Sequence, residues 1–244
     1  MKKKRQLPPG YGDNDDYVLQ RDEGRSAPFA NTSRPALSKS TWTAPPPSKK
    51  KMSAVFLSQE QTQILRLAEE GHSLFYTGSA GTGKSVLLRE IIKALRKKHS
   101  KNDDAVAITA STGIAACNIG GVTIHSFAGI GLGIESAEDL AQKIRKNKKS
   151  SSRWLRTKVL IIDEVSMLDG DLFDKLSRIG SILRKKIQPF GGIQLIVTGD
   201  FFQLPPVTKG GAETKFAFEA TLWKQAISRT FNLTKVFRQH DQVR

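Results

Sequence analysis

The chain has 244 residues, a formal net charge of +16 and a single cysteine, Cys117. One cysteine excludes an intramolecular disulfide, and no apolar run approaches the roughly 20 residues that a membrane-spanning helix needs, so we expect no membrane partner. The basic excess favours a polyanionic partner, nucleic acid before any other.

Residues 1–52 differ in composition from the rest of the chain. They hold most of the ten prolines and almost no large apolar residues. Such a segment cannot bury enough apolar surface to offset its conformational entropy. The composition therefore predicts a disordered, basic, proline-rich tail, followed by one folded α/β domain over residues 53–234.

After the tail, short apolar runs alternate with amphipathic stretches. Ser58, Gln59, Glu60 and Gln61 form a capping-box pattern, which predicts a helix that ends near Gly71. Residues 73–77 are short and apolar and predict a strand. Residues 84–98 carry apolar side chains at helical spacing and basic residues in the last turn, which predicts a helix.

Three further runs, at residues 105–109, 159–162 and 193–198, are continuously apolar or β-branched. This pattern is typical of strands buried on both faces of a parallel sheet. A helical pattern separates the last two runs. We therefore expect a mostly parallel α/β sheet with helices on both faces, whose ligands bind beyond the carboxyl ends of the strands.

The strongest motif has the pattern G-x-x-x-x-G-K-[ST] and lies between a predicted strand and a predicted helix. Its residues are Gly78, Ser79, Ala80, Gly81, Thr82, Gly83, Lys84 and Ser85. In such a P-loop the glycines let backbone N–H groups point at phosphates, the lysine contacts the β- and γ-phosphates, and the serine hydroxyl binds Mg²⁺. The motif predicts that the chain binds ATP and Mg²⁺.

Polar residues follow the next two buried strands. Asp163 and Glu164 end the run at residues 159–162 and form the acidic pair that a P-loop requires: Asp163 would hold Mg²⁺ and Glu164 would activate the attacking water. Gln203 follows the last run. It either reaches the γ-phosphate or only satisfies backbone groups in a proline-terminated loop, and spacing alone does not separate these two interpretations.

Six segments, in order, closely resemble the petite-integration-frequency (PIF-type) DNA helicases, which are 5′-to-3′ superfamily-one enzymes related to RecD. They are GSAGTGKS, TASTGIAA, TIHSFAGIG, DEVSML, PFGGIQLIVTGDFFQLPPV and KVFRQ, and the resemblance runs from about residue 57 to residue 239. It implies the first RecA-like domain of an ATP-dependent helicase that acts in genome maintenance. It also implies single-stranded and forked or structured DNA as partners, a monomer, and location in the nucleus, the mitochondrion or both.

The same resemblance implies roles for individual residues. Gln61 matches a glutamine that reads adenine, although its place in the capping box is a competing explanation. Arg238 matches an arginine finger, which neutralises charge on the γ-phosphate. The residues that match single-strand contacts are Thr109, Ser111, Thr112, Gly113, Ala116, His125 and Phe127. Without the resemblance, Phe127 would be interpreted as core and His125 as a structural histidine.

Two regions leave alternatives open. The basic stretch at residues 143–149 either lines a DNA path or forms a solvated helix face, and we favour the solvated face. Residues 235–244 match only the opening of the family's second RecA-like domain, so we expect the 244-residue chain to bind Mg·ATP without unwinding DNA.

The sequence leaves two other functions open beside the helicase. The first is a module that binds ATP and single strands without motor activity. The second is an unrelated P-loop ATPase of the clamp-loader type, which the segments GDFFQLPP and TASTGIAA disfavour.

Overall fold

The computed structural model of the protein describes residues 56–206 and 214–237. The predicted disordered tail lies outside these residues, as do Arg238 and the rest of the chain's last seven positions. Within the two described ranges, no helix has both the length and the apolar character needed to cross a bilayer.

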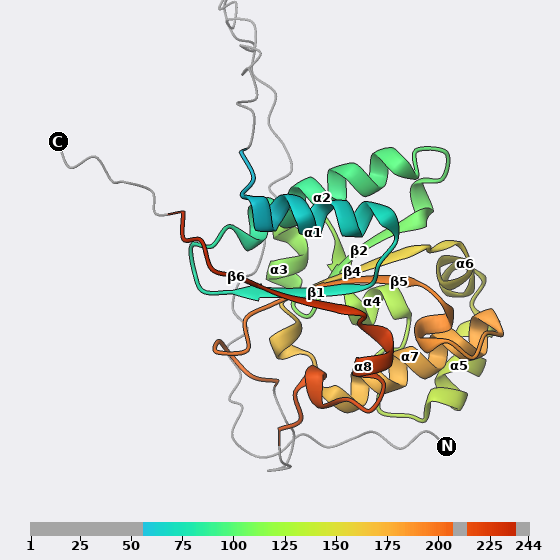
Figure 1. The fold of residues 1–244 in the computed structure, drawn as a ribbon. Helices are drawn as coiled ribbons and strands as arrows, with labels where there is room; N and C mark the ends of the chain where they lie inside the picture. Colours follow the sequence, from blue (N-terminus) through green and yellow to red (C-terminus); the bar gives the residue numbers. More distant parts are fainter. Residues whose placement is uncertain (1–55, 207–213, 238–244) are drawn as a thin grey trace, which may run out of the picture. The chain divides into compact units, whose positions relative to one another are not determined.

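A six-stranded sheet in the order β3-β2-β4-β5-β1-β6 forms the centre of the domain (Figure 1). Every neighbouring pair of strands is parallel. The strands are β1 (Leu74–Gly78), β2 (Val106–Ala110), β3 (Val122–Thr123), β4 (Val159–Asp163), β5 (Gln194–Thr198) and β6 (Arg229–Leu233). The predicted parallel sheet is therefore confirmed.

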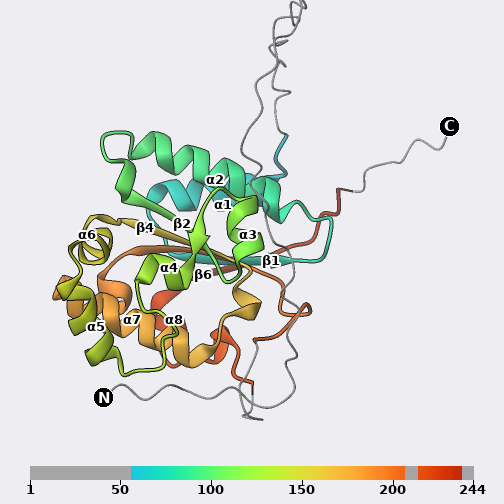
Figure 2. The same ribbon diagram turned by 180° about the vertical axis from the view of Figure 1, so that it is seen from behind.

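Helices cover both faces of this sheet. Helices α1 and α2 lie on one face, and α4, α5, α7 and α8 lie on the other, as Figures 1 and 2 show from opposite sides. Their bounds are α1 (Gln59–Glu70), α2 (Lys84–Lys98), α3 (Gly113–Asn118), α4 (Ile124–Ala128), α5 (Ala137–Lys146), α6 (Lys148–Arg156), α7 (Gly170–Arg184) and α8 (Trp223–Ala226). The basic stretch at residues 143–149 spans the end of α5 and the start of α6.

The capping box at the start of α1 forms as the sequence predicts. The Ser58 hydroxyl accepts a hydrogen bond from the Gln61 N–H at 3.2 Å, and Gln61 Oε1 accepts one from the Ser58 N–H at 3.0 Å. Gly71 ends the helix with φ of 100°, a conformation that glycine adopts without a steric cost. These local signals set where the first helix begins and ends.

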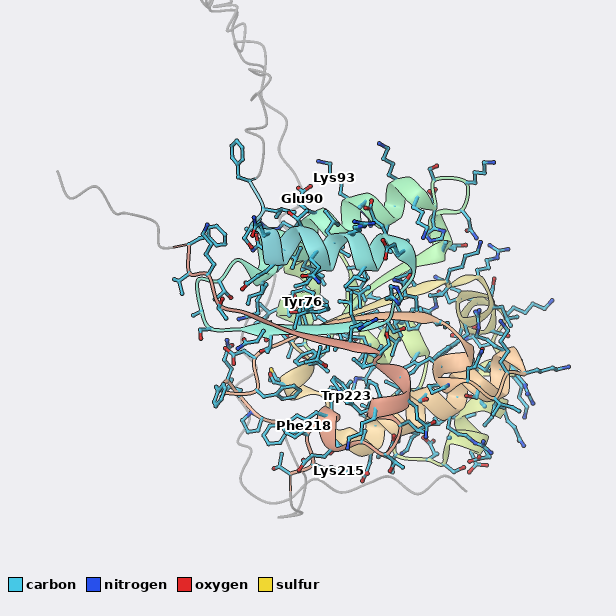
Figure 3. All side chains as sticks on the ribbon, viewed as in Figure 1. Tyr76, Glu90, Lys93, Lys215, Phe218 and Trp223 are labelled. Carbon is cyan, nitrogen blue, oxygen red and sulfur yellow. The ribbon has the colours of Figure 1, made fainter. Side chains whose placement is uncertain are left out.

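Two apolar cores lie on opposite faces of the sheet, which explains the continuously apolar strands. Ile161 and Ile196 point toward α1 and α2, while Leu195 and Val197 point toward α7. In Figure 3, the labelled Tyr76 lies on the side of α1 and α2, and Trp223 lies on the opposite side. Both faces of the central strands are therefore removed from water.

Helix α7 packs closely against the short turn η3 (Pro189–Gly191) at Gly180. A Cβ atom on Gly180 would lie 2.6 to 2.8 Å from backbone atoms of Phe190, which cannot move without shifting the turn. We therefore expect Gly180→Ala to lower the free energy of unfolding by about 1–3 kcal/mol, measured by urea denaturation. Gly113→Ala is the control, because a Cβ there meets no atom within 4 Å. Equal stabilities of the two variants would contradict the close packing.

Candidate functional site

The predicted site residues gather at the carboxyl ends of the parallel strands. The P-loop follows β1, Asp163 is the last residue of β4, and Asp200 lies just after β5. Because β4, β5 and β1 are neighbours in the sheet, these groups meet at one edge.

The P-loop backbone is shaped by its glycines. Gly81 and Gly83 have φ of 84° and 81°, in the left-handed region. A Cβ on Gly78 would lie 2.7 Å from Thr82 Oγ1 and 2.8 Å from the carbonyl oxygen of Leu233, so only glycine fits there. Gly83 caps α2 without a side-chain hydrogen bond, which leaves the first turn of that 15-residue helix free to bind an anion. The loop therefore fits a phosphate group.

Lys84 lies over the P-loop and is partly buried. Its ammonium group donates to the carbonyl oxygens of Gly78 and Ser79 and lies 3.8 Å from Asp200 Oδ2. Asp200 is only 6 % exposed, so its carboxylate faces the lysine in a site largely shielded from water. Sequence reasoning did not assign a role to Asp200. The available signal in the sequence was an aspartate just after a buried strand.

Gln61 connects α1 to the P-loop. Its side-chain amide donates to the carbonyl oxygen of Thr82 at 3.2 Å, in addition to its capping-box bonds with Ser58. The side chain is buried, and a Cβ on Gly83 would lie 2.7 Å from Gln61 Nε2. This glutamine thus supports the loop in the described conformation, and the predicted contact with adenine stays a prediction.

Asp163 and Ser85 offer the oxygen atoms that Mg²⁺ prefers. Burial raises the pKa of Asp163 from 3.8 to about 6, with a smaller contribution from Glu164, and the N–H of Glu164 and the charge of Lys84 oppose this shift. Ser85 is exposed in the first turn of α2. A carboxylate, a hydroxyl and phosphate oxygens are a suitable donor set for Mg²⁺, so these residues fit the metal.

Glu164 and Gln203 line one hollow of about 370 Å³ together with residues of α3. Gln203 also donates to Asp200 Oδ2 at 3.0 Å, so it contacts the carboxylate that faces Lys84. Thr112, from the predicted single-strand segment, lines the same hollow. The structure therefore brings the predicted catalytic glutamate and glutamine together with that segment.

The predicted single-strand residues divide into exposed and buried groups. Gly113 is exposed, and Ser111 and Thr112 are half-buried at the start of α3, which follows β2 directly (Figure 2). The Thr112 hydroxyl caps α3 by accepting from the N–H of Ala115 at 3.2 Å. Thr109 and Ala116 are buried, and the Thr109 hydroxyl donates to the Ile161 carbonyl at 2.6 Å inside the sheet. In this conformation their burial contradicts a direct side-chain contact with a DNA strand.

Phe127 also differs from the expectation of base stacking. Its ring is 3 % exposed and lies 5.3 Å, centroid to centroid, from the ring of Trp154. Without the family resemblance, the sequence predicted this core position for Phe127. His125 is half-buried, and burial lowers its pKa from the ordinary value, which disfavours its charged form. Phe127 therefore offers no exposed ring to DNA, and the environment of His125 does not favour a charge contact with phosphate.

Arg238, the predicted arginine finger, lies outside the described residues, whereas the preceding residue, Phe237, lies within them. The N–H of Phe237 donates to the Gly81 carbonyl at 2.9 Å, and the Phe237 ring would lie 3.4 Å from a Cβ on Gly83. The chain after β6 therefore passes directly over the P-loop. Sequence reasoning did not predict this contact.

The family model described as "PIF1-like helicase" matches residues 56–244. The ATP-dependent DNA helicase PIF1 of Emericella nidulans is 62 % identical over 188 residues, which are 77 % of this chain and 25 % of that protein. The chain spans about a quarter of the length of the curated relatives it matches.

Two solved structures share the fold. The Pif1 helicase of Candida albicans matches with a TM-score of 0.70 and 58 % identity, covering 76 % of this chain and 41 % of that one. The Bacteroides Pif1 helicase in complex with ADP-AlF3 and ssDNA matches with a TM-score of 0.64 and 34 % identity, covering 77 % and 44 %. The described domain thus has the RecA-like fold of these helicases, and the chain belongs to the PIF1-like helicase family.

Proposed function

We propose that this chain is the nucleotide-binding domain of an ATP-dependent, 5′-to-3′ DNA helicase that acts in genome maintenance, in the nucleus, the mitochondrion or both. The proposal is supported by family membership and by a P-loop that fits phosphate. It is also supported by helicase relatives of known structure, one of them in complex with ADP-AlF3 and ssDNA.

In this proposal the first-turn amides of α2 and Lys84 bind the phosphates of ATP. Ser85 and Asp163 hold Mg²⁺, which would neutralise phosphate charge. Lys84 turns from the carbonyl oxygens of Gly78 and Ser79 toward the phosphates. Glu164 accepts the proton of the attacking water, and Gln203 responds to the γ-phosphate through its bond to Asp200.

One observation supports the coupling of this chemistry to DNA better than any other. Ser111, in the predicted single-strand segment, donates its N–H to the Asp163 carbonyl at 3.1 Å and its hydroxyl to the Glu164 carbonyl at 2.7 Å. The backbone that would carry the metal ligand and the catalytic base is therefore bonded directly to that segment. A shift of Asp163 or Glu164 on hydrolysis would move the start of α3 and with it the grip on a strand.

We propose single-stranded DNA, with forked or structured DNA, as the partner, and ATP with Mg²⁺ as the cofactors of a monomer. Solved relatives support the DNA partners, since they include Bacteroides Pif1 bound to ssDNA and two coordinating Pif1 helicases that unwind DNA at forked dsDNA. In this chain the strand would run over the exposed start of α3 and approach backbone rather than the buried side chains.

The second candidate is a module that binds ATP and single strands without motor activity. It is favoured by the site itself, because within residues 56–206 and 214–237 the groups that face the P-loop come from a single RecA-like domain. A helicase of this class closes its nucleotide site between two RecA-like domains. We propose that unwinding needs such a second wall, with Arg238 held against the γ-phosphate as an arginine finger.

Lys84→Ala tests the proposed nucleotide site. Because Lys84 supplies the positive charge for the phosphates, we expect the variant to bind a fluorescent ATP analogue roughly 10- to 100-fold more weakly in the presence of Mg²⁺. Lys93→Ala is the matched control, since Lys93 is an exposed lysine of the same helix that faces Glu90 at 3.5 Å. Equal affinities of the two variants would reject the assignment.

A further inference from the structure

Two long stretches of the chain contain no acidic residue. The first runs from Leu140 to Ile162 and the second from Lys175 to Gly199. The fold brings them together, because Arg145 donates to the Ile182 carbonyl at 3.0 Å and Arg184 donates to the Trp154 carbonyl at 2.7 Å. The ends of α5 and α7 and the whole of α6 therefore form one surface.

Exposed cations cover this surface, which we call the basic face. In Figure 3, blue nitrogen tips project around α5, α6 and the end of α7. The basic face consists of Arg145, Lys146, Lys148, Lys149, Arg156, Lys185 and Lys186, all exposed. Among the described residues, Arg156 is the only one of these with a carboxylate at ion-pair distance, Asp104 at 2.9 Å. The other six charges face solvent without an acidic partner there.

The two lysines at the start of α6 oppose the stability of that helix. Lys148 and Lys149 lie in the first turn of α6, which contains no acidic residue. Cations at that end of a helix are disfavoured by the dipole by about 0.3–1 kcal/mol each. Crowded like charges add to this cost. Their gathering on one face is therefore better explained by a bound polyanion than by folding.

The basic face lies away from the nucleotide site. Helix α6 leads into the first residue of β4, and α7 leads through η3 into the first residue of β5, whereas the P-loop, Asp163 and Asp200 lie at the opposite strand ends. Figure 1 shows α6 at the far end of the sheet from the tip of β1. Since five-residue strands span roughly 17 Å, an anion on the basic face cannot be the nucleotide.

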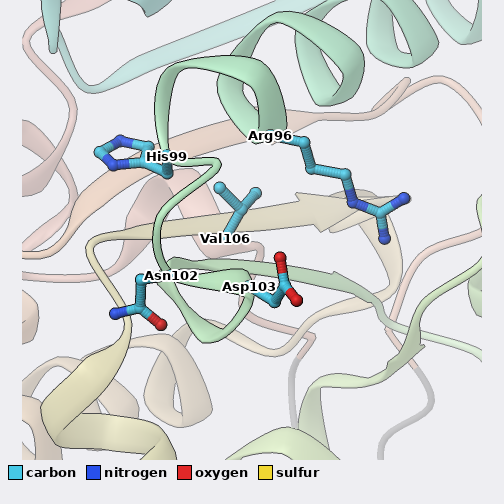
Figure 4. A pocket seen from close by; sticks show the side chains of 5 residues that line it. All are labelled: Arg96, His99, Asn102, Asp103 and Val106. Carbon is cyan, nitrogen blue, oxygen red and sulfur yellow. The ribbon is translucent and has the colours of Figure 1, made fainter.

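One edge of the basic face carries two acidic residues, Asp103 and Asp104. A hollow of about 320 Å³ at the end of α2 is lined by both Arg96 and Asp103 (Figure 4). Asp104 lies next to it and pairs with Arg156. Asp103 and Asp104 thus mark one edge of the basic face.

We propose that the basic face binds the phosphate backbone of double-stranded DNA without sequence preference. This inference rests on the proposed function, because it takes DNA as the polyanion. Single-strand sites present aromatic rings for base stacking. Here both aromatic residues, Trp154 and Phe190, are buried, and the exposed apolar side chains are the aliphatic Leu155 and Ile187. A surface of cations without rings suits phosphates held in a duplex.

The test compares two variants of the full 244-residue chain that lose the same charge. The first replaces Lys148, Lys149, Lys185 and Lys186 with glutamine. The control replaces four exposed cations elsewhere, namely Arg66, Lys93, Lys224 and Arg229. Binding to a fluorescent 20-base-pair duplex is measured by anisotropy across a salt series. Binding to a single-stranded oligonucleotide, to phosphatidylserine vesicles and to a fluorescent ATP analogue is measured in parallel.

We expect the first variant to bind the duplex at least about tenfold more weakly than the control, with a salt slope smaller by roughly 2–4, since each lost phosphate contact removes about 0.9. Single-strand and nucleotide affinities should match those of the control. Equal duplex affinities of the two variants would overturn the proposal, and so would a loss confined to vesicles. A failure of the proposed function would appear separately, as absent nucleotide binding in the unaltered chain.

Discussion

Trp154→Ala is expected to lower the free energy of unfolding by about 3–5 kcal/mol, because the indole ring is fully buried and its removal leaves a large cavity. The ring packs against Phe127, and its Nε1–H donates to the Ala128 carbonyl at 3.1 Å. The substitution therefore removes apolar contacts and leaves a buried carbonyl without its donor. Urea denaturation measures the loss.

Trp154→Phe is the matched control. It retains most of the ring packing and loses the hydrogen bond, so we expect a smaller loss of about 1–3 kcal/mol. Because Trp154 ties α6 to α4, the alanine variant should also loosen α4. An alanine variant as stable as the phenylalanine variant would show that the ring is not a core residue.

Asp163→Asn is expected to raise the free energy of unfolding by up to about 3 kcal/mol at pH 8 without Mg²⁺. Burial raises the pKa of Asp163 from 3.8 to about 6, and each pKa unit corresponds to about 1.4 kcal/mol. A raised pKa means that the folded chain binds the proton more tightly than the unfolded chain. The folded state is therefore penalised as the pH rises from about 4 through 6, and neutral asparagine carries no such penalty.

The gain from Asp163→Asn should shrink toward zero as the pH falls to about 4, where aspartate is protonated in the folded chain. Urea denaturation at several pH values, in the presence of a chelator, measures this trend. Asp103→Asn is the control, because Asp103 is exposed. Destabilisation by Asp163→Asn at pH 8 would mean that the charged carboxylate is held by favourable contacts. The same variant should lose Mg²⁺-dependent nucleotide affinity. That result would show that the charge of Asp163 serves nucleotide binding at the cost of stability.

Local patterns in the sequence determined much of the fold and part of the candidate site. The capping box at Ser58, the glycine spacing of the P-loop and the apolar strands each depend on residues a few positions apart. Such short-range physics acts within one helix, turn or strand, so it can be read without the partners. The order of these elements also predicted that Asp163 and the P-loop lie at the same ends of their strands.

Only the tertiary structure decided which side chains meet. Asp200 faces Lys84 because β5 pairs with β1, and Ser111 bonds to Asp163 and Glu164 because β2 pairs with β4. Phe127 is buried because α6, which had no clear signal in the sequence, brings Trp154 against it. The basic face likewise arises from two stretches that are separate in the chain. Strand order and helix packing bring together residues tens of positions apart, and no local pattern encodes these contacts.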